Sequence, residues 1–194
     1  MKLNKKMKNK KEVTKQKYIL YVGNAYPHKN VNKLIQAMLI LKVNEPKLKL
    51  YIVSARNVFV ARLQSEIKRL NLNNTVKILG YVEDDKLARL YKDSVAFVFP
   101  TLDEGFGLPP IEAIRAGTIV VQSEIPVLKE VFEDNAFYFD PKSADAIALK
   151  IQEALSLDLH SRNKIISRSQ KFIEKYSWLK NAAQTLQCYK NAIK

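Results

Sequence analysis

The sequence predicts an α/β fold, a Rossmann-like parallel sheet with helices on both faces. From Tyr18 onward, short runs rich in β-branched and aromatic residues alternate with amphipathic segments of helical period, the pattern of strands joined by helical crossovers. The chain has 194 residues, 47% of them apolar, which is enough to bury one sizeable core. We therefore expect one globular domain over residues 18–194, preceded by a basic disordered tail over residues 1–17.

Six runs have the composition of strands. Each is short and apolar, and most end at residues that favour turns. The six runs lie at residues 18–22, 48–53, 76–80, 95–99, 118–122 and 136–139.

Apolar residues at helical spacing predict the helices. The first ends before Pro46, and the acidic residues 83–85 suit the start of the third through the helix dipole. The closing helix, residues 177–192, carries Trp178 and Tyr189, which we interpret as core or interdomain contacts. The predicted helices lie around residues 31–39, 59–70, 87–91, 109–117, 143–155, 165–173 and 177–192.

The net charge of +14 is unevenly distributed. Residues 1–17 hold eight lysines and one glutamate, half of the excess. Such a run predicts disorder and suits anionic lipid or sequence-independent phosphate contact. No specific nucleic-acid-binding motif accompanies it. We expect either a solubilising tail or a peripheral contact with an anionic membrane.

The remaining composition indicates the compartment. No apolar run reaches the roughly 18 residues that a membrane helix needs. Cys188 is the only cysteine, so an internal disulfide is excluded and a reducing compartment fits. We expect a soluble, cytoplasmic protein.

Two loops are the places to look for a ligand. In open parallel sheets the ligand lies at the carboxyl ends of strands, near the point where strand order reverses. The first loop is GNAYPHKN, residues 23–30, and the second lies in PTLDEGFGLPPIEA, residues 100–113. We expect both loops to face the same crevice.

The second loop has the features of an anion-binding turn. Pro109 and Pro110 suit the first turn of a helix and Gly117 suits its end. Gly105 and Gly107 precede that helix, so its backbone N–H groups can approach a phosphate. The sequence thus predicts a phosphate cradle before this helix.

Two carboxylates flank the cradle. Glu104 lies in the loop and Glu112 about one turn into the helix, so both can border one pocket. Carboxylates repel phosphate but accept charge-assisted hydrogen bonds from hydroxyls. A ligand with central phosphates and hydroxyl-rich ends, such as a nucleotide-sugar, satisfies every group.

These residues resemble a known family. EGFGLPPIEA, with glutamates around seven residues, is similar to the signature of glycosyltransferase family 4, retaining enzymes of the two-domain GT-B architecture. YILYVGNAYPHKN, VKILGYVEDDKLARLY and EKYSWLKNAAQTLQCY resemble further segments of that family. The similarity runs from Tyr18 to Tyr189 and identifies the chain as the donor-binding half.

The resemblance implies roles for particular residues. Glu104 and Lys29 would be catalytic, with Glu104 on the transferred sugar and Lys29 on the diphosphate. Glu112 would hold the ribose hydroxyls. The turn from Gly80 would meet the base, with Tyr81 either packing or stacking on it. The full donor-binding set is Glu112, Gly105, Phe106, Gly107, Leu108, Gly23, Asn24, Tyr81, Val82 and Arg56.

The resemblance also implies what surrounds this site. The family needs no metal, so the expected ligand is a nucleoside-diphosphate sugar alone. Asn24 stands where many members have an arginine, and Arg56 is a candidate replacement for that cation. The acceptor site would come from an N-terminal domain or a separate subunit, without which we expect no transfer.

Alternative functions remain. A non-catalytic nucleotide-sugar-binding module or a nucleotide-sugar epimerase-like protein would share the architecture, and the chain could be a fragment, a subunit or a relic. A dinucleotide oxidoreductase is disfavoured because the first strand runs into GNAYPHKN rather than a Gly-x-Gly-x-x-Gly turn.

Overall fold

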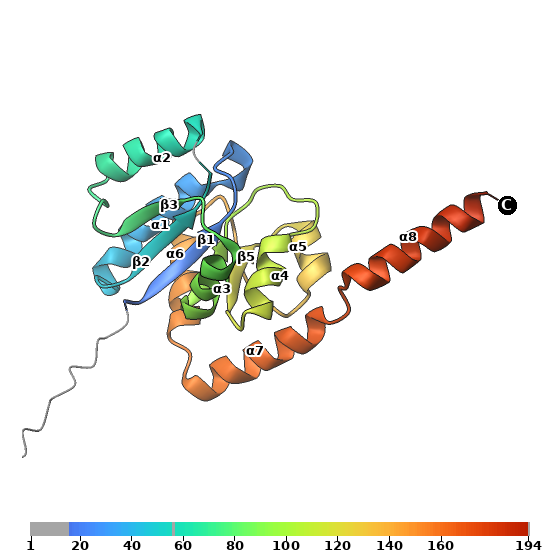
Figure 1. Ribbon diagram of the computed structural model, residues 1–194. Helices are drawn as coiled ribbons and strands as arrows, with labels where there is room; N and C mark the ends of the chain where they lie inside the picture. The colour runs from blue at the N-terminus through green and yellow to red at the C-terminus, as the bar shows by residue number, and fades with distance from the viewer. Residues whose placement is uncertain (1–15, 56, 194) are drawn as a thin grey trace, which may run out of the picture.

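The computed structural model describes residues 16–55 and 57–193. They form a six-stranded sheet in the order β3-β2-β1-β4-β5-β6, in which every neighbouring pair is parallel (Figure 1). The predicted fold class is confirmed. The strands are β1 (Tyr18–Val22), β2 (Lys49–Val53), β3 (Val76–Gly80), β4 (Ala96–Phe99), β5 (Val120–Ser123) and β6 (Phe137–Phe139).

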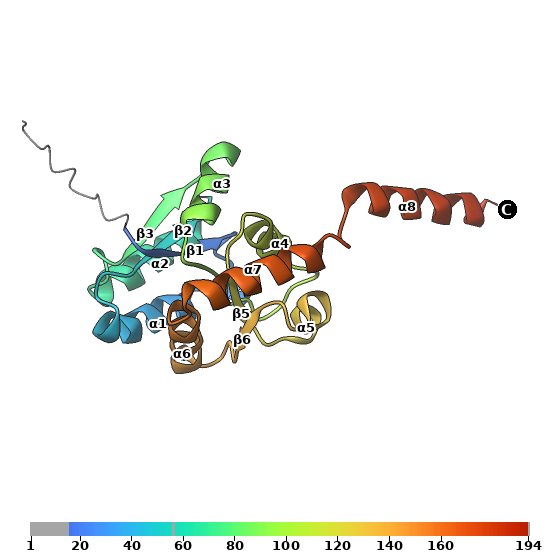
Figure 2. The same ribbon diagram turned by 90° about the horizontal axis from the view of Figure 1, so that it is seen from below.

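The helices cover both faces of this sheet. Helices α1 and α6 pack against each other on one face, and α3 and α4 lie on the other (Figure 2). Helix α7 then returns across the molecule to pack on α4. The helices are η1 (Pro27–Lys29), α1 (Val31–Asn44), α2 (Val58–Arg69), α3 (Asp84–Asp93), α4 (Leu108–Arg115), α5 (Pro126–Phe132), α6 (Ala144–Leu155), α7 (Leu159–Ile173) and α8 (Trp178–Ala192).

The core explains why the central strands are apolar throughout. Ile19, Leu20 and Tyr21 of β1 have no exposed surface, nor do Phe97 and Val98 of β4. A parallel strand covered on both faces buries consecutive side chains, so it lacks the alternation of a half-exposed strand. This rigid centre fixes where the loops after β1 and β4 begin.

Several elements differ from the sequence predictions, α5 and β5 among them. Helix α5 was not predicted, because its seven residues span too few turns to display a clear helical period. Strand β5 begins at Val120 rather than Thr118, whose hydroxyl instead donates to the carbonyl of Tyr91 at 2.5 Å.

Helix α8 extends away from the body (Figures 1 and 2), and no residue between Trp178 and Ala192 is buried. Trp178 is 72% exposed and Tyr189 is 65% exposed, so the interpretation of these residues as core is wrong. Their interpretation as an interdomain contact stays a prediction.

Other predictions fall on residues that the structure does not describe. The basic tail lies outside the described residues except for Gln16 and Lys17, and Arg56 lies outside them as well. In the part of the chain that is described, no helix combines the length and apolarity needed to cross a bilayer.

Candidate functional site

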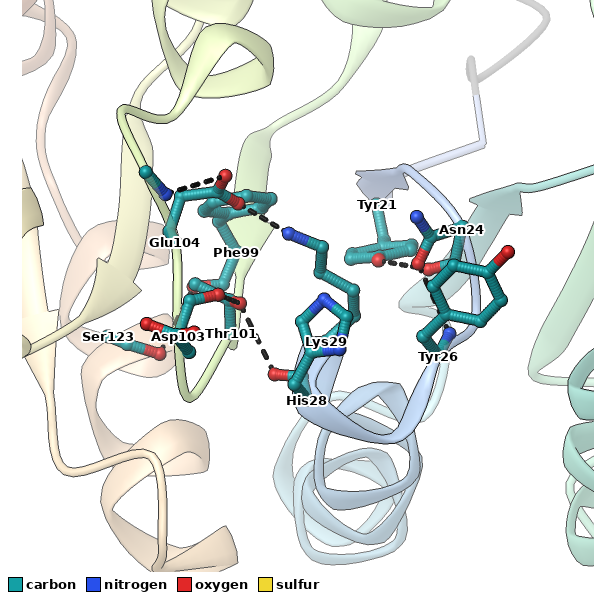
Figure 3. A network of polar contacts seen from close by, with 11 residues as sticks. Tyr21, Asn24, Tyr26, His28, Lys29, Phe99, Thr101, Asp103, Glu104 and Ser123 are labelled. Carbon is teal, nitrogen blue, oxygen red and sulfur yellow. Dashed lines mark hydrogen bonds and ion pairs between the residues drawn. The ribbon is translucent and has the colours of Figure 1, made fainter.

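Strand order reverses between β1 and β4, and the loops that follow these strands meet there. The His28 carbonyl accepts hydrogen bonds from the Leu102 amide at 2.7 Å and the Thr101 hydroxyl at 3.2 Å (Figure 3). Asn30 donates from Nδ2 to the Pro100 carbonyl at 3.0 Å and to the Pro141 carbonyl at 2.8 Å. Because both loops line one groove, the predicted shared crevice is confirmed.

Lys29 and Glu104 face each other across this groove (Figure 3). Lys29 Nζ lies 2.6 Å from Glu104 Oε2, and the two side chains are only 14% and 18% exposed. The ammonium also lies 5.8 Å from the centre of the Phe99 ring, within cation–π range. A partly desolvated cation is therefore held where the predicted diphosphate would lie.

The first loop leaves β1 through a glycine that the structure requires. Gly23 has φ 150°, and a Cβ there would lie 2.9 Å from the Tyr21 hydroxyl. That hydroxyl donates to the Asn24 carbonyl at 2.6 Å, and burial, followed by the charge of Glu104, raises the pKa of Tyr21. Asn24 itself is exposed and accepts from the Tyr26 amide at 3.2 Å. It supplies hydrogen-bonding groups at the groove but no cation.

The second loop enters α4 as the sequence predicts. Gly107 is the N-cap residue with φ 92°, the two prolines lie in the first turn, and Gly117 with φ 80° follows the helix. A Cβ on Gly107 would lie 3.0 Å from Leu128 Cδ2, so the backbone packs closely here. No side chain caps α4. Pro109 and Pro110 have no N–H group, so the Leu108 amide is the backbone donor that the first turn offers, and the positive end of the helix dipole meets the groove.

Glu112 lies apart from Glu104. Its carboxylate is on the exposed side of α4, where Oε2 accepts a hydrogen bond from the Tyr91 hydroxyl of α3 at 2.9 Å. It lines a second hollow between α4 and the segment joining α7 to α8, and this hollow meets the first at Phe106 and Leu108. The expectation that one pocket holds both carboxylates is therefore wrong, because they line adjoining hollows. The Phe106 ring, which lines both hollows, packs against Tyr176 with 5.2 Å between ring centres.

The residues of the turn after β3 differ in how exposed they are. Gly80 has φ 73°, Tyr81 is 81% exposed and Val82 is 8% exposed. The interpretation of Tyr81 as a packing residue is therefore wrong. Val82 belongs to the buried hydrophobic core, so its side chain is not presented to a ligand.

Sequence reasoning missed two residues that organise the site, Tyr21 and Tyr91. Both were interpreted only as apolar members of a strand and a helix. Their hydroxyls bond to groups 3 and 21 residues away along the chain, respectively. The one sequence signal was that a buried tyrosine hydroxyl usually has a partner.

Comparison with known proteins identifies the family of the chain. A family model described as glycosyl transferases group 1 matches residues 4–172. The chain belongs to the group 1 glycosyl transferases.

Relatives of this group 1 glycosyl transferase are named mannosyltransferases. The chain is 34% identical over 164 residues to the O-antigen chain mannosyltransferase RfbU of Salmonella typhimurium, covering 84% of this chain and 44% of the relative. It is 34% identical over 176 residues to O-antigen chain mannosyltransferase B of Escherichia coli, covering 90% and 46%. The chain thus spans about half the length of these curated relatives.

Solved structures agree with the fold. A sucrose-phosphate synthase from Thermosynechococcus elongatus superposes with a TM-score of 0.82 at 25% identity, covering 92% of this chain and 46% of that one. The fold of that synthase therefore matches this chain over 92% of its length.

Proposed function

We propose that this chain is the donor-binding half of a retaining glycosyltransferase that moves a hexose from a nucleoside-diphosphate sugar to a glycan, lipid or polysaccharide precursor. The observation that carries the proposal is a single groove lined by Lys29, Glu104 and the amino end of α4. The cation and the helix dipole suit a diphosphate, while the carboxylate suits sugar hydroxyls.

The chemistry follows from where charge develops. As the bond to the anomeric carbon breaks, negative charge grows on the departing diphosphate and the sugar gains oxocarbenium character. Lys29 turns from Glu104 toward the diphosphate, and the backbone N–H groups of Phe106, Gly107 and Leu108 stabilise the leaving group and the sugar. Glu104 then accepts from a sugar hydroxyl. Retention requires the acceptor to attack on the face from which the diphosphate departs.

Glu112 and the turn after β3 define the nucleoside end of the site. The exposed Glu112 carboxylate accepts from the ribose hydroxyls, and the exposed Tyr81 ring stacks on the base beside the backbone of Val82. With Asn24 in the first loop, Lys29 provides the positive charge at the diphosphate unless Arg56 adds a second cation. The relatives named mannosyltransferases make mannose the first sugar to test.

The acceptor comes from a second domain or subunit in this proposal. Two observations support it: the chain covers less than half of its matched relatives, and α8 carries an apolar stripe with no cover within the described residues. The stripe consists of Trp178, Ala182, Leu186 and Tyr189. The partner would cover this stripe, and the lysine-rich tail would contact an anionic membrane. The isolated chain would then bind donor without sustained transfer.

The test is a thermal-shift panel of mannose joined to guanosine, uridine or adenosine diphosphate. A ligand that binds only the folded state stabilises it by about 2.7 kcal/mol at a hundredfold excess over Kd, so one base should stand out. Glu112→Ala should greatly reduce that shift, whereas Glu130→Ala, at an exposed glutamate on α5, should preserve it. An equal response from Glu112→Ala and the parent protein contradicts the ribose assignment, and sustained turnover by the isolated chain contradicts the need for a partner.

A further inference from the structure

A hydrogen bond between α3 and α4 joins a buried tyrosine hydroxyl to an exposed carboxylate. The Tyr91 side chain is 3% exposed, and its hydroxyl donates to Oε2 of the exposed Glu112 at 2.9 Å. We propose that Tyr91 is a positioning residue, which orients the Glu112 carboxylate so that it grips the two ribose hydroxyls of the donor. This inference rests on the proposed function.

Tyr91 is held in place through its ring and through its backbone carbonyl. Its ring packs against Phe97 of β4, with ring centres 5.5 Å apart. Its carbonyl accepts from the Thr118 hydroxyl at 2.5 Å and the Ser94 hydroxyl at 2.8 Å. The ring contact and the two bonds to the backbone carbonyl thus hold Tyr91 against the sheet, although it lies near the end of a surface helix.

Glu112, by contrast, has little else to hold it. It is exposed on α4, and the cation one turn later on that helix, Arg115, instead donates to the Tyr176 carbonyl at 2.8 Å. A glutamate on a helix surface samples several rotamers. A ligand that requires one of them binds more weakly, because fixing that rotamer costs side-chain conformational entropy. The bond from Tyr91 selects the rotamer before the ligand arrives.

The bond also decides which oxygen is left for the ligand. Burial, and then the neighbouring Glu112 charge, raises the pKa of the Tyr91 phenol, so it remains a neutral donor at every ordinary pH. Tyr91 occupies one lone pair of Oε2 and leaves Oε1 and the remaining lone pairs to accept. A carboxylate held in this way can accept from two adjacent hydroxyls, as on the 2′ and 3′ carbons of ribose.

A simpler reading is that Glu112 only satisfies a buried hydroxyl. The two readings differ in one measurable property, the discrimination between a ribose and a 2′-deoxyribose. Positioning makes that discrimination depend on the Tyr91 hydroxyl, whereas a purely structural bond changes stability and leaves the ratio of the two affinities unchanged.

The experiment measures Kd by calorimetry for GDP, UDP and ADP and for their 2′-deoxy forms. For the nucleotide that binds most tightly, Tyr91→Phe should raise the Kd of the ribose form about tenfold and raise that of the 2′-deoxy form, which keeps only the 3′ hydroxyl, by a smaller factor. In a Glu112→Ala background the same substitution should have no further effect. Tyr18→Phe is the matched control, because that buried hydroxyl also bonds to α3, at the Leu90 carbonyl (2.9 Å), away from Glu112.

The outcomes separate the two proposals. If Glu112→Ala leaves the ribose form bound as before, the proposed function fails at its nucleoside end. If Glu112→Ala weakens binding but Tyr91→Phe does not, or weakens both forms equally, the positioning role is overturned. Should Tyr91→Phe fail to fold, Glu112→Asp tests the same point from the exposed partner. Its shorter side chain must bring the affinity ratio toward one, and an unchanged ratio overturns the inference.

Discussion

Glu104→Gln should make the protein bind a free nucleoside diphosphate more tightly. Glu104 Oε2 lies 2.6 Å from Lys29 Nζ, and both side chains are mostly buried. A diphosphate that reaches Lys29 therefore competes with a carboxylate and is repelled by it. Glutamine preserves the shape of the side chain while removing both effects.

Coulomb's law sets the size of the change. Two like charges about 5 Å apart repel by about 3 kcal/mol at an effective dielectric constant near 20. Because the groove is open to solvent, salt and water reduce this figure, and we expect about 1.4 kcal/mol, a tenfold lower Kd. For the nucleotide-sugar, the gain is cancelled by loss of the hydrogen bond that a sugar hydroxyl donates to the Glu104 carboxylate, which contributes about 1.5–3 kcal/mol.

Calorimetry with GDP, UDP, ADP and their mannose derivatives, at low and high salt, measures both effects. Glu124→Gln is the matched control. It breaks an ion pair with Lys129 of 2.9 Å whose side chains are 55% and 44% exposed, and it should leave both affinities unchanged. Free diphosphate bound equally or more weakly by Glu104→Gln would refute the reasoning.

Two further predictions concern stability. Gly107→Ala should lower the free energy of unfolding, measured in urea, by about 2–4 kcal/mol, because the residue has a positive φ and its new Cβ would overpack against Leu128. Gly105→Ala places its Cβ in open space and should be close to neutral. Equal losses in the two variants would contradict this explanation. Burial, and then nearby charges, raises the pKa of Tyr18 to about 12 from 10.0, so the folded state retains a proton that the unfolded state releases. Its contribution to stability is complete below pH 10 and is lost between pH 10 and 12, and a urea midpoint that falls equally steeply in Tyr18→Phe would contradict it.

The elements of the site could largely be predicted because they depend on local rules. Proline in a first turn and glycine after a last turn mark α4 whatever surrounds it, and both predicted ends are confirmed. Local rules failed where the elements were short or unusually exposed. The seven-residue α5 has too few turns to show a period, and Trp178 looked like a core residue because amphipathic spacing cannot identify what covers a helix.

By itself, the sequence determined the α/β class, the two loops that line the groove and the family to which the chain belongs. Only the tertiary structure decided which side chains meet: Lys29 with Glu104, 75 residues apart, and Tyr91 with Glu112, 21 residues apart. It also separated the two glutamates into adjoining hollows. The physical reason is that turns and caps arise from steric limits on neighbouring residues, whereas contacts between distant residues depend on the order in which strands pair and on the packing of helices against them.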